Sequence, residues 1–256
     1  MTAWQFELKN GIVESIDASK LRLAALVGQS RQQIEQMPLP INGQVASIGE
    51  AFTVSLADTD EASILFRGDL KNVHGLAAQH SSGRFLVEGN VGDYFAAGCS
   101  GGVIELNGNA GDFVGGAVAG KRLGASGGII HCHRDIGSHG GHRMRRGLLI
   151  VDGDAGPSLG ASMIAGTIGI AGNAGPNLGC EMKRGTILLR HPWSDEFARS
   201  PRYSEALAFN AGFLRLFRAE PMKQWLRSLL DSEHLSRVRA DVSAGGMGEI
   251  LFAAGV

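Results

Sequence analysis

Short alternations of hydrophobic and polar residues recur through the middle of the chain, and each ends at a turn-forming residue. Leu86 and Glu88 alternate before Gly89, and Val151 precedes Asp152 in the same way. Alternation with a period of two is typical of a β-strand, and no apolar run in this region has the length and spacing of a helix. The pattern therefore predicts many short strands separated by glycine turns.

The predicted strands belong to a repeat of 19 residues. Residues 147–165 and 166–184 share glycines, a proline and a leucine at matching positions: GLLIVDGDAGPSLGASMIA and GTIGIAGNAGPNLGCEMKR. The first residue of the turn marks each unit, with steps of 21, 19, 26, 19, 19 and 19: Gly68, Gly89, Gly108, Arg134, Gly153, Gly172 and His191. The step of 26 places a seven-residue insertion within Val118–Gly127. A fixed period of this length indicates stacked repeats.

The turns indicate how the units stack. An Asx residue, a small residue and glycine follow most markers, which suits a tight turn with positive φ. We expect these Asx side chains to form hydrogen-bonded turns that stack from coil to coil. Stacking also predicts two interior rows: Leu149 on Ile168 on Ile187, and Met144 on Met163 on Met182. The prediction is a mainly β protein, a parallel β-helix of about seven coils over residues 45–192.

The N-terminal segment, residues 1–44, lies outside the repeat and is predicted to be a short cap. Phe6 and Leu8 favour a strand. Ser30 and Gln33 fit the capping box of a short helix. An open solenoid end exposes strand edges, so this segment is expected to cover one end.

The C-terminal segment, residues 193–256, is predicted to be an α-helical extension. Apolar residues at helical spacing indicate a first helix: Leu207, Ala211, Leu214 and Phe217. Pro221 suits the first turn of a second helix that carries Trp225, Leu226, Leu229 and Leu230. The stretch Ser243–Gly248 is expected to be flexible or to become ordered on a partner.

Composition narrows the function classes. The chain has 256 residues, a net charge of -1 and 44% hydrophobic residues, with no basic bias toward nucleic acid or membrane. The first residues carry no signal-peptide pattern, and no apolar run reaches membrane-spanning length. Three cysteines, Cys99, Cys132 and Cys180, are odd in number and have no metal-ligand spacing. We expect a cytoplasmic protein without nucleic-acid or membrane partners.

Four of the eight histidines lie within twelve residues, and three of them could hold a metal: His131, His133 and His139. The repeat frame gives a second interpretation. It aligns His131 and His133 with outward positions of the preceding coil, and Cys132 with Leu106 in the core. Because the spacing matches no known zinc pattern, we favour a polar surface or an intersubunit contact, with the metal site as the alternative.

The densest positive run contains Arg143, Arg145 and Arg146, with Lys183 two units along on the same side. These arginines fit a contact for an acidic cofactor tail or a partner carboxylate, or a solvated outer face. The chain shows no recognisable catalytic centre. Its Gly-Asn-Ala-Gly turns recur without the following helix that a nucleotide-binding loop requires.

Two spaced glycine motifs carry a family resemblance: Gly153–Gly156–Gly160 and Gly172–Gly175–Gly179. They resemble right-handed β-helix domains of two branches. One is the C-terminal domain of the glutamate synthase large subunit. The other is the C subunit of formylmethanofuran dehydrogenase and of its bacterial relative, the formyltransferase/hydrolase complex. Over roughly residues 25–192, the order of segments resembles the second branch: the capped helix Ser30–Gln36, then Ile48–Val54, then the solenoid.

The resemblance implies a non-catalytic structural subunit. Its partners would be an amidohydrolase-like A subunit, a B subunit and a formyltransferase D subunit. That complex moves a formyl group from formyl-tetrahydromethanopterin to a methanofuran-type carrier and hydrolyses it to formate. Zinc is expected in the amidohydrolase-like partner, with no cofactor on this chain. Arg143, Arg145 and Arg146 would then contact the glutamate-bearing tail of the carrier.

Three alternatives remain open. Eighteen arginines against six lysines argue against a hyperthermophile, and so favour the bacterial complex over the C subunit of an archaeal formylmethanofuran dehydrogenase. A free-standing glutamate-synthase-type module would serve an amidotransferase complex. A small metalloenzyme like the left-handed β-helix carbonic anhydrases would need six-residue repeats, and a 19-residue unit does not divide into sixes.

Overall fold

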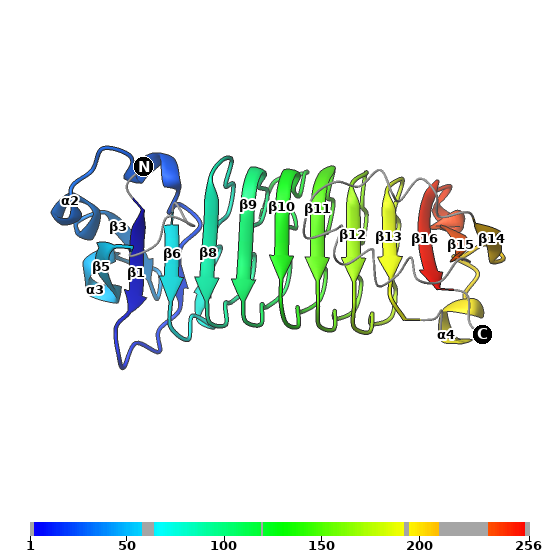
Figure 1. Ribbon diagram of the computed structural model, residues 1–256, viewed down its shortest axis with the longest axis horizontal. Helices are drawn as coiled ribbons and strands as arrows, with labels where there is room; N and C mark the ends of the chain where they lie inside the picture. Colours follow the sequence, from blue (N-terminus) through cyan, green and yellow to red (C-terminus); the bar gives the residue numbers. More distant parts are fainter. Residues whose placement is uncertain (1–2, 58–63, 119, 192–194, 210–234, 254–256) are drawn as a thin grey trace.

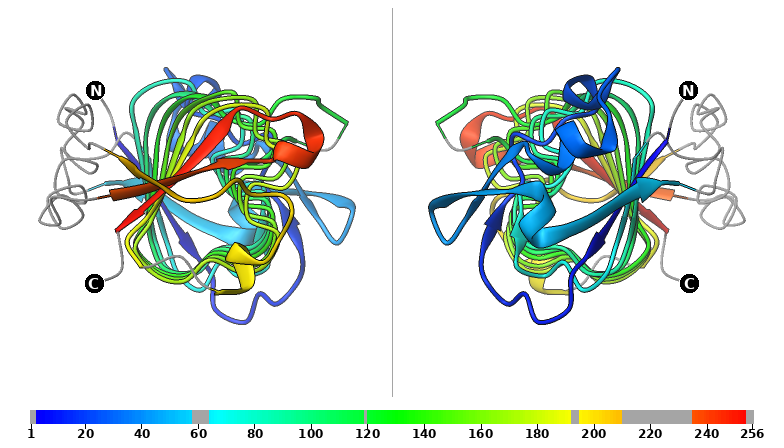
Figure 2. Two further views of the ribbon diagram at one scale, coloured as in Figure 1. Left: turned by 90° about the vertical axis from the view of Figure 1, so that its right-hand side faces the viewer. Right: turned by 90° about the vertical axis from the view of Figure 1, so that its left-hand side faces the viewer.

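The computed structural model describes residues 3–57, 64–118, 120–191, 195–209 and 235–253. Its main feature is a long twelve-stranded sheet. Seven strands of the repeat pair in parallel, each with the next: β6 (Ile64–Arg67), β8 (Arg84–Glu88), β9 (Ser100–Asn107), β10 (Ser126–Cys132), β11 (Arg146–Val151), β12 (Thr167–Ile170) and β13 (Thr186–Leu189). They lie side by side along the long axis, and the connecting segments return on the opposite side of the molecule (Figures 1 and 2). The predicted long array of short parallel strands is confirmed.

The core lies inside the stacked coils. Leu149, Ile168 and Ile187 are in register on neighbouring strands, and all three are fully buried. The predicted methionine row is fully buried as well: Met144, Met163 and Met182. Viewed down the long axis, successive coils overlie one another around this shared interior (Figure 2). Both predicted interior rows are therefore confirmed.

The Asx turns stack as predicted. Each Asx Oδ1 accepts a hydrogen bond from the backbone N–H of its counterpart in the next coil, along Asn90, Asn109, Asp135, Asp154 and Asn173. These donor–acceptor distances run from 2.6 to 3.1 Å. A row of parallel bridges lies beside this ladder, from Leu70 to Ala174. The side-chain ladder satisfies turn N–H groups that a strand would otherwise pair.

The N-terminal segment covers one end of the solenoid. β1 (Trp4–Leu8) pairs in parallel with β6 and antiparallel with β5 (Phe52–Leu56), which becomes the outer strand of the sheet. A second, four-stranded sheet has the order β4 (Gln44–Ser47), β3 (Pro38–Ile41), β2 (Ile16–Asp17) and β7 (Val73–His74). Three short helices complete the segment: α1 (Leu23–Leu26), α2 (Arg31–Glu35) and α3 (Ile48–Ala51). Ile34 and Ile48 are buried in the same core cluster as the coils.

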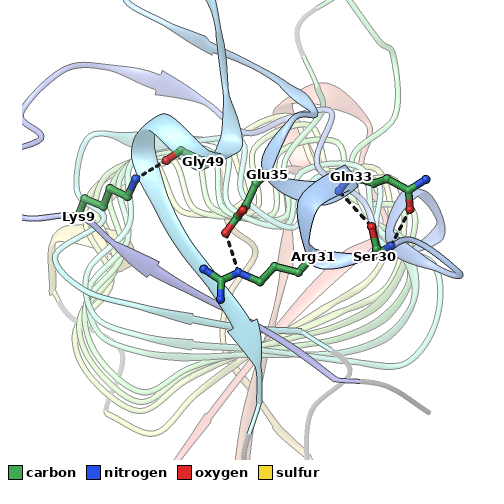
Figure 3. A network of polar contacts seen from close by, with 6 residues as sticks. All are labelled: Lys9, Ser30, Arg31, Gln33, Glu35 and Gly49. Carbon is green, nitrogen blue, oxygen red and sulfur yellow. Dashed lines mark hydrogen bonds and ion pairs between the residues drawn. The ribbon is translucent and has the colours of Figure 1, made fainter.

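The predicted capping box is present at the start of α2 (Figure 3). Ser30 N–H donates to Gln33 Oε1 at 2.8 Å, and Gln33 N–H donates to Ser30 Oγ at 3.3 Å. An ion pair between Arg31 and Glu35 follows along the helix, and Lys9 reaches the Gly49 carbonyl at α3 (Figure 3). The predicted strand at Phe6 and Leu8 and the predicted capped helix are both confirmed.

The predicted C-terminal helical extension is not supported by the described residues. Leu207 lies in a strand, β14 (Leu207–Phe209), which pairs with β15 (Leu235–Ala240). β15 pairs antiparallel with β16 (Gly248–Ala253), and β16 pairs in parallel with β13. The described part of this segment contains only two short helical turns: α4 (Asp195–Ala198) and a 3-10 turn, η2 (Val242–Ala244). The remaining residues of the two predicted helices, from 210 to 234, lie outside the described residues.

The physical reason for this correction is the open end of the solenoid. Without β16, the outer edge of β13 and the core beside Ile187 would face water. Ile250 and Val238 are buried where they cover that end. The stretch Ser243–Gly248, expected to be flexible or to become ordered on a partner, holds a turn and the start of β16 in this chain. In the described part of the chain, no helix is long and apolar enough to cross a membrane.

Candidate functional site

A groove of about 780 Å³ lies on the turn side of the solenoid. Its lining comes from the insertion, from neighbouring coils and from the C-terminal segment: Arg122, Leu123, Arg143, Ser162, Ile164, Glu181, Lys183 and Ala244. Of the three arginines predicted to bind an acidic group, Arg143 lines the groove. Arg145 and Arg146 are exposed and are not part of its lining. Lys183 joins Arg143 there, on the side that the repeat predicts.

The turn geometry explains why Arg143 separates from its neighbours. Arg143, Ser162 and Glu181 have φ of 55°, 53° and 57°, and are spaced 19 residues apart. The left-handed conformation is adopted at the same point of each coil, so the three side chains leave the backbone in similar directions. Arg146 instead begins β11. One local run of arginines therefore serves two surfaces.

The groove carries more positive than negative charge. Three cations, Arg122, Arg143 and Lys183, face one carboxylate, Glu181, which gives a net charge of +2 (3 − 1) for the lining. Glu181 Oε2 accepts a hydrogen bond from Ser162 Oγ at 2.9 Å. No ion pair between described residues involves any of the three cations. Guanidinium and ammonium groups that form no ion pair within the described chain suit carboxylate ligands.

A second cluster lies on the outer face of the parallel sheet, at the ends of β10 and β11. His131 Nε2 lies 2.8 Å from Asp152 Oδ2, and His133 Nδ1 lies 3.0 Å from the same oxygen. The two imidazole rings have centroids 3.9 Å apart. Partial burial raises the pKa of Asp152, but the hydrogen bonds from His131 and His133 outweigh it and hold that pKa below its ordinary value.

The backbone register explains why both rings point outward. Cys132 pairs with Leu106 on one side and with Val151 on the other, and all three are fully buried. Burial strongly raises the pKa of the Cys132 thiol, so this cysteine is an inert core residue. Alternation then places His131 and His133 on the outer face. The predicted inward and outward positions are confirmed.

His139 lies in a different environment from the other two candidate ligands. Its ring stacks on Phe113 with centroids 4.8 Å apart, and Phe113 stacks in turn on Tyr94. Among the described residues, the potential metal ligands that lie within 4.8 Å of one another are His131, His133 and Asp152. The predicted pair of histidines is together, but the predicted third ligand is not with them. Asp152 was missed, although it follows His133 by one repeat of 19 residues.

Comparisons with known proteins find similarity in sequence and in structure. No protein-family model matches the chain. Over 86 residues it is 32% identical to the C subunit of tungsten-containing formylmethanofuran dehydrogenase 2 from Methanothermobacter marburgensis. That match covers 32% of this chain and 32% of the relative, so the matched region spans about a third of the curated protein.

The structural relative covers nearly the whole chain. It is a chain of the formyltransferase/hydrolase complex (FhcABCD) from Methylorubrum extorquens, whose crystal structure contains methylofuran. The TM-score is 0.72 and the sequence identity is 26%. The match covers 98% of this chain and 100% of that chain. Both the N-terminal cap and the C-terminal strands therefore fall within the matched architecture.

Proposed function

Since this chain belongs to the family formed by the C subunit of formylmethanofuran dehydrogenase and its counterpart in the formyltransferase/hydrolase complex, we propose that it is a non-catalytic structural subunit of such a complex. The observation that carries the proposal is the end-to-end structural match, with 98% and 100% of the two chains covered. The finer description of the fold as a right-handed parallel β-helix of about seven coils is part of the proposal. The 19-residue offset between paired strands supports it.

The proposed complex transfers a formyl group from formyl-tetrahydromethanopterin to a methanofuran-type carrier and releases formate. An amidohydrolase-like A subunit with zinc, a B subunit and a formyltransferase D subunit would be its other members. This chain would supply a rigid surface for their assembly, without a catalytic residue of its own. The structurally similar chain belongs to a formyltransferase/hydrolase complex with methylofuran bound, which supports this assignment.

A tagged full-length chain, captured from cells of its native host, tests the assignment by mass spectrometry and metal analysis. We expect an amidohydrolase-like protein and a formyltransferase in fixed ratio with this chain, together with zinc. Tungsten or molybdenum in the eluate would favour the dehydrogenase, the second candidate, which the 32% identical segment supports. Amidotransferase components, or the chain alone, would overturn the proposal.

The basic groove is proposed to hold the acidic tail of the carrier. Arg143 provides the central contact, with Arg122 and Lys183 beside it, because these cations line one groove and have no ion-pair partner among the described residues. Arg145 and Arg146 are exposed outside the groove lining, and we propose that they contact carboxylates of the tail beyond the groove.

Charge reversal tests this contact in the assembled complex. We expect Arg143→Glu to raise the KM for the carrier about 10-fold or more, with a smaller change in kcat, because a charge-assisted hydrogen bond contributes about 1.5–3 kcal/mol. Arg190→Glu is the matched control, since Arg190 is an exposed arginine outside the groove lining. Equal KM values for the two variants would rule out the groove as the tail contact.

A further inference from the structure

The structure places three potential metal ligands at one point on the outer face of the sheet. His131 and His133 are two residues apart at the end of β10, so the strand turns both rings to the same side. Asp152 occupies the position of His133 one coil further along. β10 and β11 are adjacent strands in the middle of the parallel array (Figure 1). The backbone beneath the cluster is therefore fixed by strand pairing on both sides.

The three side chains converge instead of spreading into solvent. Both imidazoles direct a ring nitrogen to the same oxygen, Asp152 Oδ2, at 2.8 and 3.0 Å. The side chain of His131 is 14% exposed, and those of His133 and Asp152 are 37% and 36% exposed. Histidine side chains on an ordinary solvated surface have no reason to direct two rings to one carboxylate oxygen. The cluster is thus partly shielded but open to an ion from the water side.

The distances suit a small transition-metal ion. Zinc binds imidazole nitrogen and carboxylate oxygen at about 2.0–2.2 Å, so its ligand atoms lie about 3.3 Å apart in a tetrahedral site. The observed nitrogen–oxygen distances would need to widen by only a few tenths of an ångström. Magnesium and calcium prefer oxygen ligands, whereas imidazole suits zinc, nickel, copper and iron.

Among the described residues, no fourth metal ligand completes the cluster. On the β11 side, Ile150 pairs with His131 in register and offers no ligand atom. On the β9 side, Glu105 pairs with His131 in register, but its carboxylate is bound to Arg84 at 2.7 Å. Three protein ligands with one open position form the arrangement that binds a metal together with water or an external donor.

We propose that His131, His133 and Asp152 form a binding site for one divalent transition-metal ion of the zinc class. Metal binding would replace the two hydrogen bonds between ring nitrogen and carboxylate, and each displaced hydrogen would move to the other nitrogen of its ring or to water. Its open position accepts water or a donor atom from another molecule. All three ligands belong to this chain, so the site is independent of the function proposed above.

The test uses the purified full-length chain, freed of metal with a chelator and then titrated with Co²⁺ and Zn²⁺. We expect one equivalent to bind, with the visible absorption of four-coordinate cobalt, and we expect zinc to raise the midpoint of thermal unfolding. His131→Ala and Asp152→Asn should each weaken binding about 100-fold or more, because loss of a ligand exceeds the 10–100-fold cost of losing a supporting contact.

Two controls keep the result interpretable. His139→Asn removes a nearby histidine outside the cluster, and asparagine tolerates the positive φ of 60° at that position. It should bind metal like the unmodified chain. Circular dichroism of Asp152→Asn checks that the fold is retained. Absence of a stoichiometric site, or equal binding by His131→Ala and His139→Asn, would overturn the proposal.

Discussion

His80 is a buried histidine whose surroundings disfavour its charged form. Its side chain is buried, its Nε2 lies 3.2 Å from the Gly83 carbonyl, and its ring meets the edge of Phe85. Burial lowers the pKa of His80. The unfolded chain therefore takes up this proton at a higher pH than the folded chain, near the ordinary value of about 6.5.

The sign of the resulting pH dependence follows from that difference. The contribution of neutral His80 is complete above the unfolded pKa and is lost as pH falls toward the lower folded pKa. We predict that the free energy of unfolding falls between pH 7 and pH 5, and falls less steeply in His80→Gln, whose amide can still donate to Gly83. Urea denaturation at a series of pH values measures both slopes. Parallel curves would contradict the prediction.

The success of sequence reasoning at single residues depended on whether the repeat frame was used. The frame placed Cys132 inside and His131 outside, because strand alternation is strict. The metal alternative instead grouped histidines that are close in sequence, and so chose His139 in place of Asp152. Contacts in a solenoid join equivalent positions of neighbouring coils. A search at an offset of 19 residues from His133 would have found Asp152.

At the scale of elements, the Asx ladder makes each turn depend on the preceding one. Asp154 donates its N–H to Asp135, and its Oδ1 accepts from both the N–H and the side-chain amide of Asn173. We predict that Asp154→Ala lowers the free energy of unfolding by about 1 kcal/mol, the net value of a hydrogen bond. Asp154→Asn keeps an acceptor oxygen and should lose less than half as much. Chemical denaturation compares the two, and equal losses would contradict the ladder's contribution.

The elements divide into those fixed by local chemistry and those fixed by distant contacts. The turns and strands of the repeat were predictable because glycine, Asx and alternation all favour one structure. The segment around Leu207 was not, since a few apolar residues at helical spacing fit a helix or a strand equally well. Pairing of β16 with β13 depends on the exposed end of the solenoid, which no local pattern records.

At the scale of the whole molecule, the C-terminal strands cover a surface that would otherwise associate with other chains. Ile250 is fully buried, and it pairs with Ile187 on one side and Val238 on the other. We predict that Ile250→Asp detaches β16, because an unpaired buried carboxylate is strongly unfavourable, and that the uncovered edge of β13 promotes self-association. Light scattering after size-exclusion chromatography, at rising protein concentration, measures this.

A neighbouring residue provides the control for that experiment. Glu249 alternates with Ile250 on β16, and its carboxylate accepts a hydrogen bond from Thr186 Oγ1 at 2.9 Å. Glu249→Gln keeps an oxygen acceptor and buries no charge. We expect it to elute like the unmodified chain. Equal self-association of the two variants would show that β16 does not protect the edge.

The constant spacing of the coils has a consequence for length. Eight parallel strands from β6 to β16 make seven steps of about 4.8 Å, or about 34 Å in all. Loss or gain of one complete 19-residue unit would move the two covered ends by a single step and leave the cross-section unchanged. The insertion within Val118–Gly127 adds residues without adding a step. The distance between molecules bound at the two ends therefore depends on the number of coils, and not on the number of residues.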